Sequence, residues 1–145
     1  MTVHTMRIEG QCLCGAVRVR GTPARGHVEA CHCRMCRKWG SAALLSVQCG
    51  SPVEIDGEEH VVRYQSSRWA ERGFCGRCGS SLFFRFLLGD AYAFSAGLFP
   101  DAALQPIAEE IFIDEKPAYY AFDSDAEKLT GAEVIAKAEA AGFTF

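Results

Sequence analysis

Cys75-Gly76-Arg77-Cys78-Gly79 stands just before the apolar run Ser81–Leu87 (SLFFRFL), whose aromatic residues favour a strand. Cys12-Leu13-Cys14 stands just before Ala16–Arg20 (AVRVR), which alternates apolar and polar residues as a half-buried strand does. The glycine after C-x2-C lets the backbone curl, and an extended C-x-C turns both side chains to one side. The two pairs therefore predict a closed, structural four-thiolate zinc site that joins distant parts of the chain.

Other interpretations of these pairs are a thioredoxin-like redox pair at Cys75 and Cys78, or plain buried thiols. A redox C-x2-C opens a helix, whereas this pair is expected to follow a turn and lead into a strand. The N-terminal residues lack the apolar stretch of a signal peptide, so we expect a cytoplasmic protein with reduced thiols. In a reducing compartment, close-set cysteines more often bind metal than form disulfides.

A second cysteine motif, Cys31-His32-Cys33-Arg34-Met35-Cys36, places three thiols within six residues. Such a tight loop can supply three corners of a tetrahedron but not easily the fourth, and three protein ligands with an exchangeable position are typical of a catalytic zinc. The alternative is that a protein group closes the site. Candidates are His32, Cys49, His27 and His60, although the neighbours of His32 point the other way in an extended segment. Cys49 lies in an apolar run, which favours a buried structural thiol.

Basic residues surround this second motif. Arg34, Arg37 and Lys38 flank it directly, and residues 1–85 hold 12 Lys and Arg against 7 Asp and Glu. One interpretation is a solvated basic loop that balances thiolate charge, and the other is a rim that binds substrate carboxylates. The net charge of +5 in this part is larger than the negative charge of about -3 that two zinc–thiolate sites would carry. Some positive field should therefore remain for an anionic ligand. An acidic overall pI of 5.8 and the lack of a long basic cluster argue against nucleic acid.

The rest of the chain predicts one mainly β domain over residues 1–145. It contains no apolar run near the roughly 20 residues that a membrane-spanning helix needs. Thr130 and Glu133 form a capping box, and Gly142 is a suitable stop, so we expect one helix over about 131–141. Short β-like runs separated by turn residues precede it; besides the two above, they are Ala42–Cys49, Val61–Gln65, Tyr92–Leu98 and Glu110–Asp114.

Three motifs resemble the glutathione-dependent formaldehyde-activating enzyme (GFA) family, which includes centromere protein V. They are G-Q-C-L-C-G-A-V (Gly10–Val17), C-H-C-R-M-C-R-K-W-G (Cys31–Gly40) and R-G-F-C-G-R-C-G-S (Arg72–Ser80). The resemblance covers a core of about 7–115 and leaves 116–145 as a C-terminal extension. It implies an Mss4-like fold of small antiparallel sheets around zinc.

By that likeness two zinc ions are expected, one structural and one catalytic. The structural ion would be held by Cys12, Cys14, Cys75 and Cys78, and the catalytic ion by Cys31, Cys33 and Cys36. The family reaction joins glutathione and formaldehyde, so the resemblance implies a zinc-dependent carbon–sulfur lyase. From their position beside the second motif, Arg34, Arg37 and Lys38 are expected to bind the carboxylates of the thiol. A non-catalytic zinc module with two structural sites stays open as the alternative. Exposed strand edges in such proteins often pair, which would give a homodimer.

Overall fold

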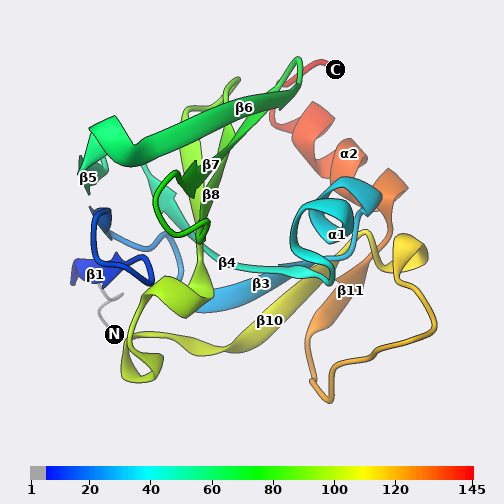
Figure 1. The fold of residues 1–145 in the computed structure, drawn as a ribbon. Helices are drawn as coiled ribbons and strands as arrows, with labels where there is room; N and C mark the ends of the chain where they lie inside the picture. The colour runs from blue at the N-terminus through cyan, green and yellow to red at the C-terminus, as the bar shows by residue number, and fades with distance from the viewer. Residues whose placement is uncertain (1–5) are drawn as a thin grey trace. The chain divides into compact units, whose positions relative to one another are not determined.

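The computed structural model describes residues 6–145 and divides the chain into two compact units. The first unit combines the residues up to Gly26 with Ser46–Gln105, and the second combines His27–Leu45 with Pro106–Phe145. Strands dominate the described residues, and the α-helices among them, α1 (Arg34–Gly40) and α2 (Gly131–Ala140), belong to the second unit (Figure 1). The predicted mainly β class with a C-terminal helix is confirmed, whereas the single-domain organisation stays a prediction.

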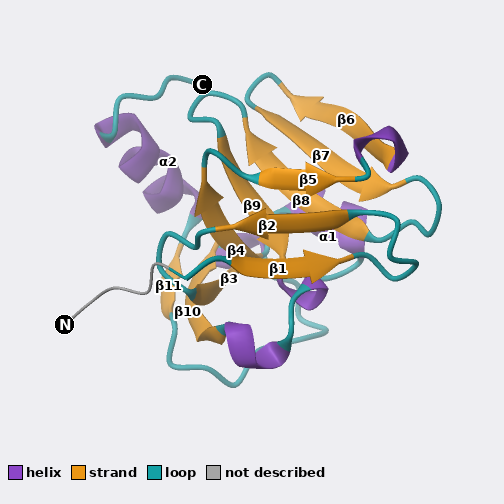
Figure 2. Cartoon of the chain, turned by 90° about the vertical axis from the view of Figure 1, so that its left-hand side faces the viewer, coloured by secondary structure: helices purple, strands orange, loops and turns teal. Residues whose placement is uncertain are grey.

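The first unit is built from antiparallel strands. Its strands are β1 (Ile8–Gln11), β2 (Arg18–Gly21), β4 (Leu44–Gly50, here from Ser46), β5 (Glu54–Asp56), β6 (Val61–Ser67), β7 (Ala70–Cys75), β8 (Ser81–Phe86) and β9 (Ala91–Ser95). One sheet has the order β1-β2-β5 (Figure 2), and a second series runs β4-β9-β8-β7-β6, in which β6 to β9 are joined as successive hairpins. A 3-10 turn at Glu58–His60 lies between β5 and β6, and two more, at Ala96–Leu98 and Asp101–Ala103, follow β9.

The core of the first unit explains why these strands form. Phe83 of β8 and Phe94 of β9 are fully buried, and their rings meet edge to face with centroids 6.3 Å apart. Burial of each ring stabilises the fold by about 1.5–3 kcal/mol. At Gly73 of β7 a Cβ atom would lie 2.3 Å from the Phe83 ring, so only glycine allows this packing. Cys12 and Cys75 are buried in the same core, which therefore holds one sulfur atom of each of the two cysteine pairs in place.

The second unit carries the other cysteine motif. Its strands are β3 (His27–Cys31), β10 (Gln105–Ile111, here from Pro106) and β11 (Glu127–Leu129), in the order β11-β10-β3, and a 3-10 turn occupies Ile113–Glu115. The pairing of β10 with β11 is parallel, with Glu110 opposite Lys128, so not every pair is antiparallel as predicted. The chain reaches β11 through the irregular segment 116–126, whose residues contribute to the site described below.

The C-terminal helix α2 confirms the prediction to within one residue. The Thr130 side chain accepts a hydrogen bond from the Glu133 amide, and Glu133 returns one to the Thr130 amide. Gly142 adopts the left-handed conformation that ends such helices. Most of the helix surface is exposed, Ile135 included at 42%. Within residues 6–145, no helix has the length and apolar character needed to cross a bilayer.

Several strand boundaries differ from the prediction. The predicted strand Glu110–Asp114 ends at Ile111, because Phe112 takes a left-handed conformation (φ 53°) and a 3-10 turn follows. The predicted run Tyr92–Leu98 ends as a strand at Ser95 and continues as a 3-10 turn. Strand β3 and helix α1, which surround the second cysteine motif, were not predicted as such.

Candidate metal centres

The four-cysteine cluster of the first unit brings together the thiols of both predicted pairs. The sulfur atoms of Cys12, Cys14, Cys75 and Cys78 all lie within 4.8 Å of one another. The Cys12–Cys14 and Cys14–Cys75 sulfur distances are 3.7 and 3.8 Å. Tetrahedral zinc, about 2.3 Å from each sulfur, would separate its ligands by about 3.8 Å. The donor set and its dimensions therefore fit one zinc ion.

Two turns position these sulfurs. Cys12 and Cys14 follow β1, while Cys75 ends β7 and Cys78 lies in the hairpin that leads into β8. The prediction that Cys75 follows a turn is therefore wrong, because the pair closes a β-hairpin. Gly79 makes that hairpin possible, since its φ of +79° suits glycine and its amide donates to the Cys75 carbonyl at 2.7 Å.

Backbone amides also point at the sulfurs. The Val17 amide donates to Cys12 Sγ at 3.3 Å, and the Arg77 amide donates to Cys75 Sγ at 3.4 Å. An amide that donates to sulfur stabilises the thiolate, and the thiolate is the form of cysteine that binds zinc. The local backbone is thus arranged for metal-binding sulfur rather than for inert buried thiols.

Ser80 links the two turns. Its hydroxyl oxygen accepts a hydrogen bond from the Leu13 amide at 3.1 Å and lies 3.2 Å from Cys78 Sγ. Hydrogen bonding from Ser80 lowers the pKa of Cys78 to about 5. At Cys14 the Ala16 amide favours the thiolate, but burial and the neighbouring thiols outweigh it and raise the pKa to about 11. Several thiolates this close repel one another, and a divalent cation removes that conflict.

The three-cysteine cluster lies entirely in the second unit. The sulfur atoms of Cys31, Cys33 and Cys36 lie within 4.8 Å of one another. Cys31 ends β3, Cys33 caps the start of α1, and Cys36 belongs to the first helical turn, where its amide donates to Cys33 Sγ at 3.4 Å. The motif is therefore a strand end joined to a short helix rather than the simple loop that we predicted. The pKa of Cys31 is strongly raised by the two neighbouring thiols and by burial.

No fourth ligand for this cluster comes from the described residues of its own unit. His32 is excluded because both ring nitrogens are engaged: Nδ1 lies 2.7 Å from the Tyr120 hydroxyl and Nε2 lies 2.9 Å from Glu110 Oε1. No other His, Cys, Asp or Glu of this unit brings a ligand atom within 4.8 Å of all three sulfurs. Cys49 belongs to the first unit, and its burial in the core at 1% exposure confirms the prediction of a buried thiol. That burial raises the pKa of Cys49 to about 11.

The three predicted substrate-binding cations all lie on α1 but in different settings. Arg34 and Lys38 are exposed, and the Arg34 amide is held by Glu115 Oε1 at 2.9 Å. Arg37 is half-buried, and its Nε donates to the His32 carbonyl at 3.0 Å. Arg34 and Lys38 thus remain accessible to a ligand, whereas Arg37 also contributes to the structure around the cysteines.

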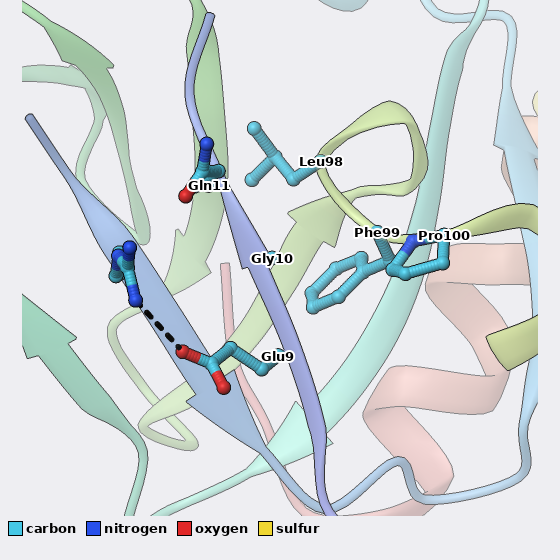
Figure 3. Close-up of a pocket in the computed structure, with 7 residues that line it drawn as sticks. Glu9, Gly10, Gln11, Leu98, Phe99 and Pro100 are labelled. Atoms are coloured by element: carbon cyan, nitrogen blue, oxygen red, sulfur yellow. Dashed lines mark ion pairs between the residues drawn. The ribbon is translucent and has the colours of Figure 1, made fainter. Parts of the chain in front are cut away.

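The first unit also has a surface pocket, whose lining residues include no cysteine of either cluster. It lies between β1, β2 and the segment Leu98–Pro100 (Figure 3), and Glu9 and Arg18 in its wall form an ion pair at 3.7 Å. At Gly10 a Cβ atom would lie 2.5 Å from the Leu98 carbonyl oxygen, so glycine is required there. The pocket contains no cysteine or histidine, and we assign no chemistry to it.

Comparison with known proteins finds related sequences. The model of the family described as glutathione-dependent formaldehyde-activating enzyme matches residues 7–115, which hold all the clustered cysteines. An uncharacterized lyase of Schizosaccharomyces pombe is 33% identical over 128 residues, covering 88% of this chain and 93% of that protein. A Halomonas elongata protein that bears the family's name is 34% identical over 86 residues, 53% of this chain and 55% of that protein.

A crystal structure of a Rhodobacter sphaeroides protein shares the fold. It is superposed with a TM-score of 0.58 at 23% identity, over 70% of this chain and 100% of that one. The family match spans most of the chain, and the lyase relative spans nearly all of it. The chain belongs to the glutathione-dependent formaldehyde-activating enzyme family.

Proposed function

We propose that this protein is a zinc-dependent carbon–sulfur lyase that adds a thiol, glutathione or a similar one, to formaldehyde or another small carbonyl compound. The observation that carries the proposal is the cluster of Cys31, Cys33 and Cys36, for which the described residues of its unit supply no fourth ligand. Three protein ligands with one exchangeable position are the arrangement of catalytic zinc sites. The names of the family and of its relatives, a lyase and a glutathione-dependent formaldehyde-activating enzyme, support this proposal.

The reaction suits this donor set. Zinc held by Cys31, Cys33 and Cys36 would offer a fourth position that suits a soft ligand, and a substrate thiol bound there would be kept as the nucleophilic thiolate at neutral pH. The thiol gives up its proton, and its sulfur forms a bond to the carbonyl carbon as the carbon–oxygen π bond breaks. The carbonyl oxygen takes up one proton in return, so no oxidant or reductant is consumed. The reverse reaction breaks the same carbon–sulfur bond.

Residues of α1 bind and orient the thiol in this proposal. Arg34 and Lys38 present exposed cations on the helix that carries Cys36, where they attract the carboxylates of glutathione. Glu115 holds the Arg34 amide and so fixes the beginning of the helix. Arg37 contributes positive charge while it supports the His32 carbonyl.

The four-cysteine cluster has a structural role in this proposal. Its four thiols complete a tetrahedral shell, and two of them are buried in the core of the first unit. A closed shell offers no position to a substrate. We therefore assign the first zinc to folding and the second to catalysis.

Exchange NMR with glutathione and formaldehyde tests the activity. Thiols and formaldehyde combine spontaneously, so the exchange rate is measured with the protein, without it, with Cys31→Ser and with Cys49→Ala. We expect acceleration by the wild type and by Cys49→Ala, and only the protein-free rate with Cys31→Ser. Absence of acceleration by a wild type that carries two zinc ions would instead favour the non-catalytic zinc module.

The location and the oligomeric state stay predictions. None of the eight cysteines, all of which lie within residues 6–145, forms a disulfide bond, and this supports the proposal of a reducing, cytoplasmic setting. A homodimer is checked by light scattering on the purified, zinc-loaded protein, where a mass near 15.8 kDa would contradict it.

A further inference from the structure

A hydrogen-bond network centred on two buried side chains, His32 and Glu110, begins next to the three-cysteine cluster. It runs from Tyr120 through His32 to Glu110 and Ser124, with distances of 2.7, 2.9 and 2.7 Å. The His32 side chain is fully buried and that of Glu110 is 2% exposed. Lys128 approaches the far oxygen of Glu110 at 3.8 Å. All of these residues belong to the second unit.

The hydrogen bonds can be assigned a single direction. The Ala43 amide donates to the Tyr120 oxygen, which leaves the Tyr120 hydroxyl proton for His32 Nδ1. Burial by itself would raise the pKa of Glu110, but hydrogen bonds from Ser124 and His32 outweigh it and lower that pKa. Glu110 is therefore a carboxylate that accepts from the His32 Nε2–H, and every member of the network is satisfied.

His32 is held by its backbone as well as by its ring. Its amide donates to the Ile111 carbonyl at 3.0 Å, and its carbonyl accepts from Arg37 Nε at 3.0 Å. The Tyr120 ring stacks on the imidazole, with centroids 5.5 Å apart and planes 23° apart. Every polar group of this one residue is bonded, so its position and orientation are fixed from several sides.

Fixing His32 also fixes the two sulfurs beside it. Successive side chains of an extended chain point to opposite sides, and Cys33 has extended backbone angles (φ -64°, ψ 155°). With the imidazole turned into the interior, Cys31 and Cys33 point the other way, where their sulfurs meet that of Cys36. Packing alone does not explain why His32 and Glu110 are buried here. Apolar side chains of similar size would fill the same space without the cost of burying a carboxylate.

Part of the network lies outside the residues that the family model matches. Tyr120 and Ser124 follow residue 115, where that match ends, and belong to the irregular segment between β10 and β11. The segment after residue 115 thus supplies two of the hydrogen-bonding groups in this network, Tyr120 and Ser124.

We propose that Glu110 and Tyr120 are positioning residues that act through His32 to hold Cys31 and Cys33 in place for the metal. This inference rests on the proposed zinc at the three-cysteine cluster. Groups that orient metal ligands from behind typically change metal affinity by about 10–100-fold. The effect is expected at this cluster alone, because the four-cysteine cluster has its own supports in the first unit.

Chelator competition on the two-zinc protein tests the inference. Tyr120→Phe removes one hydroxyl and keeps the ring, and it should weaken zinc binding at one of the two sites about ten-fold. Glu110→Ala should weaken the same site by up to about 100-fold, whereas Glu110→Gln keeps an acceptor for His32 Nε2–H and should restore most of the affinity. Tyr119→Phe is the matched control, because it removes the same hydroxyl from the neighbouring residue, which is 70% exposed.

Cobalt loading separates positioning from general destabilisation. We expect saturating cobalt to give altered ligand-field bands at one site in Tyr120→Phe and an unchanged spectrum in Tyr119→Phe. Unchanged affinity in both Tyr120→Phe and Glu110→Ala, or an equal loss at both zinc sites, would overturn the inference and leave the proposed function standing. If the wild-type protein binds only one zinc ion, both this inference and the proposed function are overturned.

Discussion

The two cysteine clusters use the same ligand atom but are built from different structural elements. Two turns, one after β1 and one in the β7–β8 hairpin, meet to form the four-cysteine cluster, and they come from positions more than sixty residues apart. The three-cysteine cluster is local, formed by the end of β3 and the first turn of α1. Cross-linking distant strands suits a structural metal, whereas a local cluster can leave a coordination position open. The difference predicts that the same substitution has different consequences in the two clusters.

The largest expected effect is loss of the fold on breaking the four-cysteine cluster. Cys75→Ser should release that zinc and abolish cooperative thermal unfolding, because structural zinc supplies on the order of 10 kcal/mol in small zinc domains. Circular dichroism melts and zinc analysis measure this. Cys49→Ala, a buried thiol outside the cluster, is the control and should cost about 1 kcal/mol. A Cys75→Ser variant that melts like Cys49→Ala would remove the distinction between the clusters.

The second prediction is that breaking the three-cysteine cluster abolishes function but not the fold. Cys31→Ser should keep one zinc per chain and a cooperative melt, because the supports of the first unit are untouched. Zinc analysis, melting and the exchange NMR experiment are run on the same sample. If Cys31→Ser unfolds as Cys75→Ser does, both sites are structural and the lyase proposal loses its main support.

The third prediction concerns the pH at which the four-cysteine cluster releases zinc. Ser80→Ala removes the hydrogen bond that lowers the pKa of Cys78 to about 5, so that pKa should rise towards its ordinary value. Protons then compete with the metal at higher pH, and the midpoint of zinc release on acidification should move upwards. A metal-indicator titration from neutral to acid pH measures the shift. An unchanged or lower midpoint would mean that Ser80 does not support the thiolates.

The smallest effect is expected at the basic residues of α1. Arg34→Ala and Lys38→Ala should each raise the KM for glutathione by up to about five-fold, since each removes one exposed cation, and should leave zinc content unchanged. An uncharged thiol such as 2-mercaptoethanol is the control substrate and should show no such rise. Equal changes for both thiols would indicate that these cations do not bind carboxylates.

The sequence predicted both clusters because metal ligands must be close and of defined types. The short spacings C-x-C and C-x2-C-G marked the four ligands of the first cluster. The structure brings them together as expected: Cys12, Cys14, Cys75 and Cys78. The C-terminal helix was equally predictable, because the capping box at its beginning and the glycine at its end are local sequence signals. These features are encoded locally, where spacing alone carries the information.

The supports of the clusters could not be predicted from the sequence. Glu110 and Tyr120 are 78 and 88 residues from His32, and no motif marks them as its partners. Helix α1 was missed because its seven residues are too few for a recognisable period, and its beginning depends on Cys33 as a cap. Ser80 could have been suspected, since it directly follows C-x2-C-G, but its bond to the Leu13 amide depends on the tertiary fold.

Cadmium NMR of the metal-exchanged protein tests the open corner of the three-cysteine cluster most directly, because it reports each site separately. We predict two resonances, of which the one absent from Cys31→Ser shifts on addition of glutathione towards the position of a four-sulfur site, while the other stays in place. Two resonances that both indicate four sulfurs without added thiol, or that both ignore glutathione, would contradict the account.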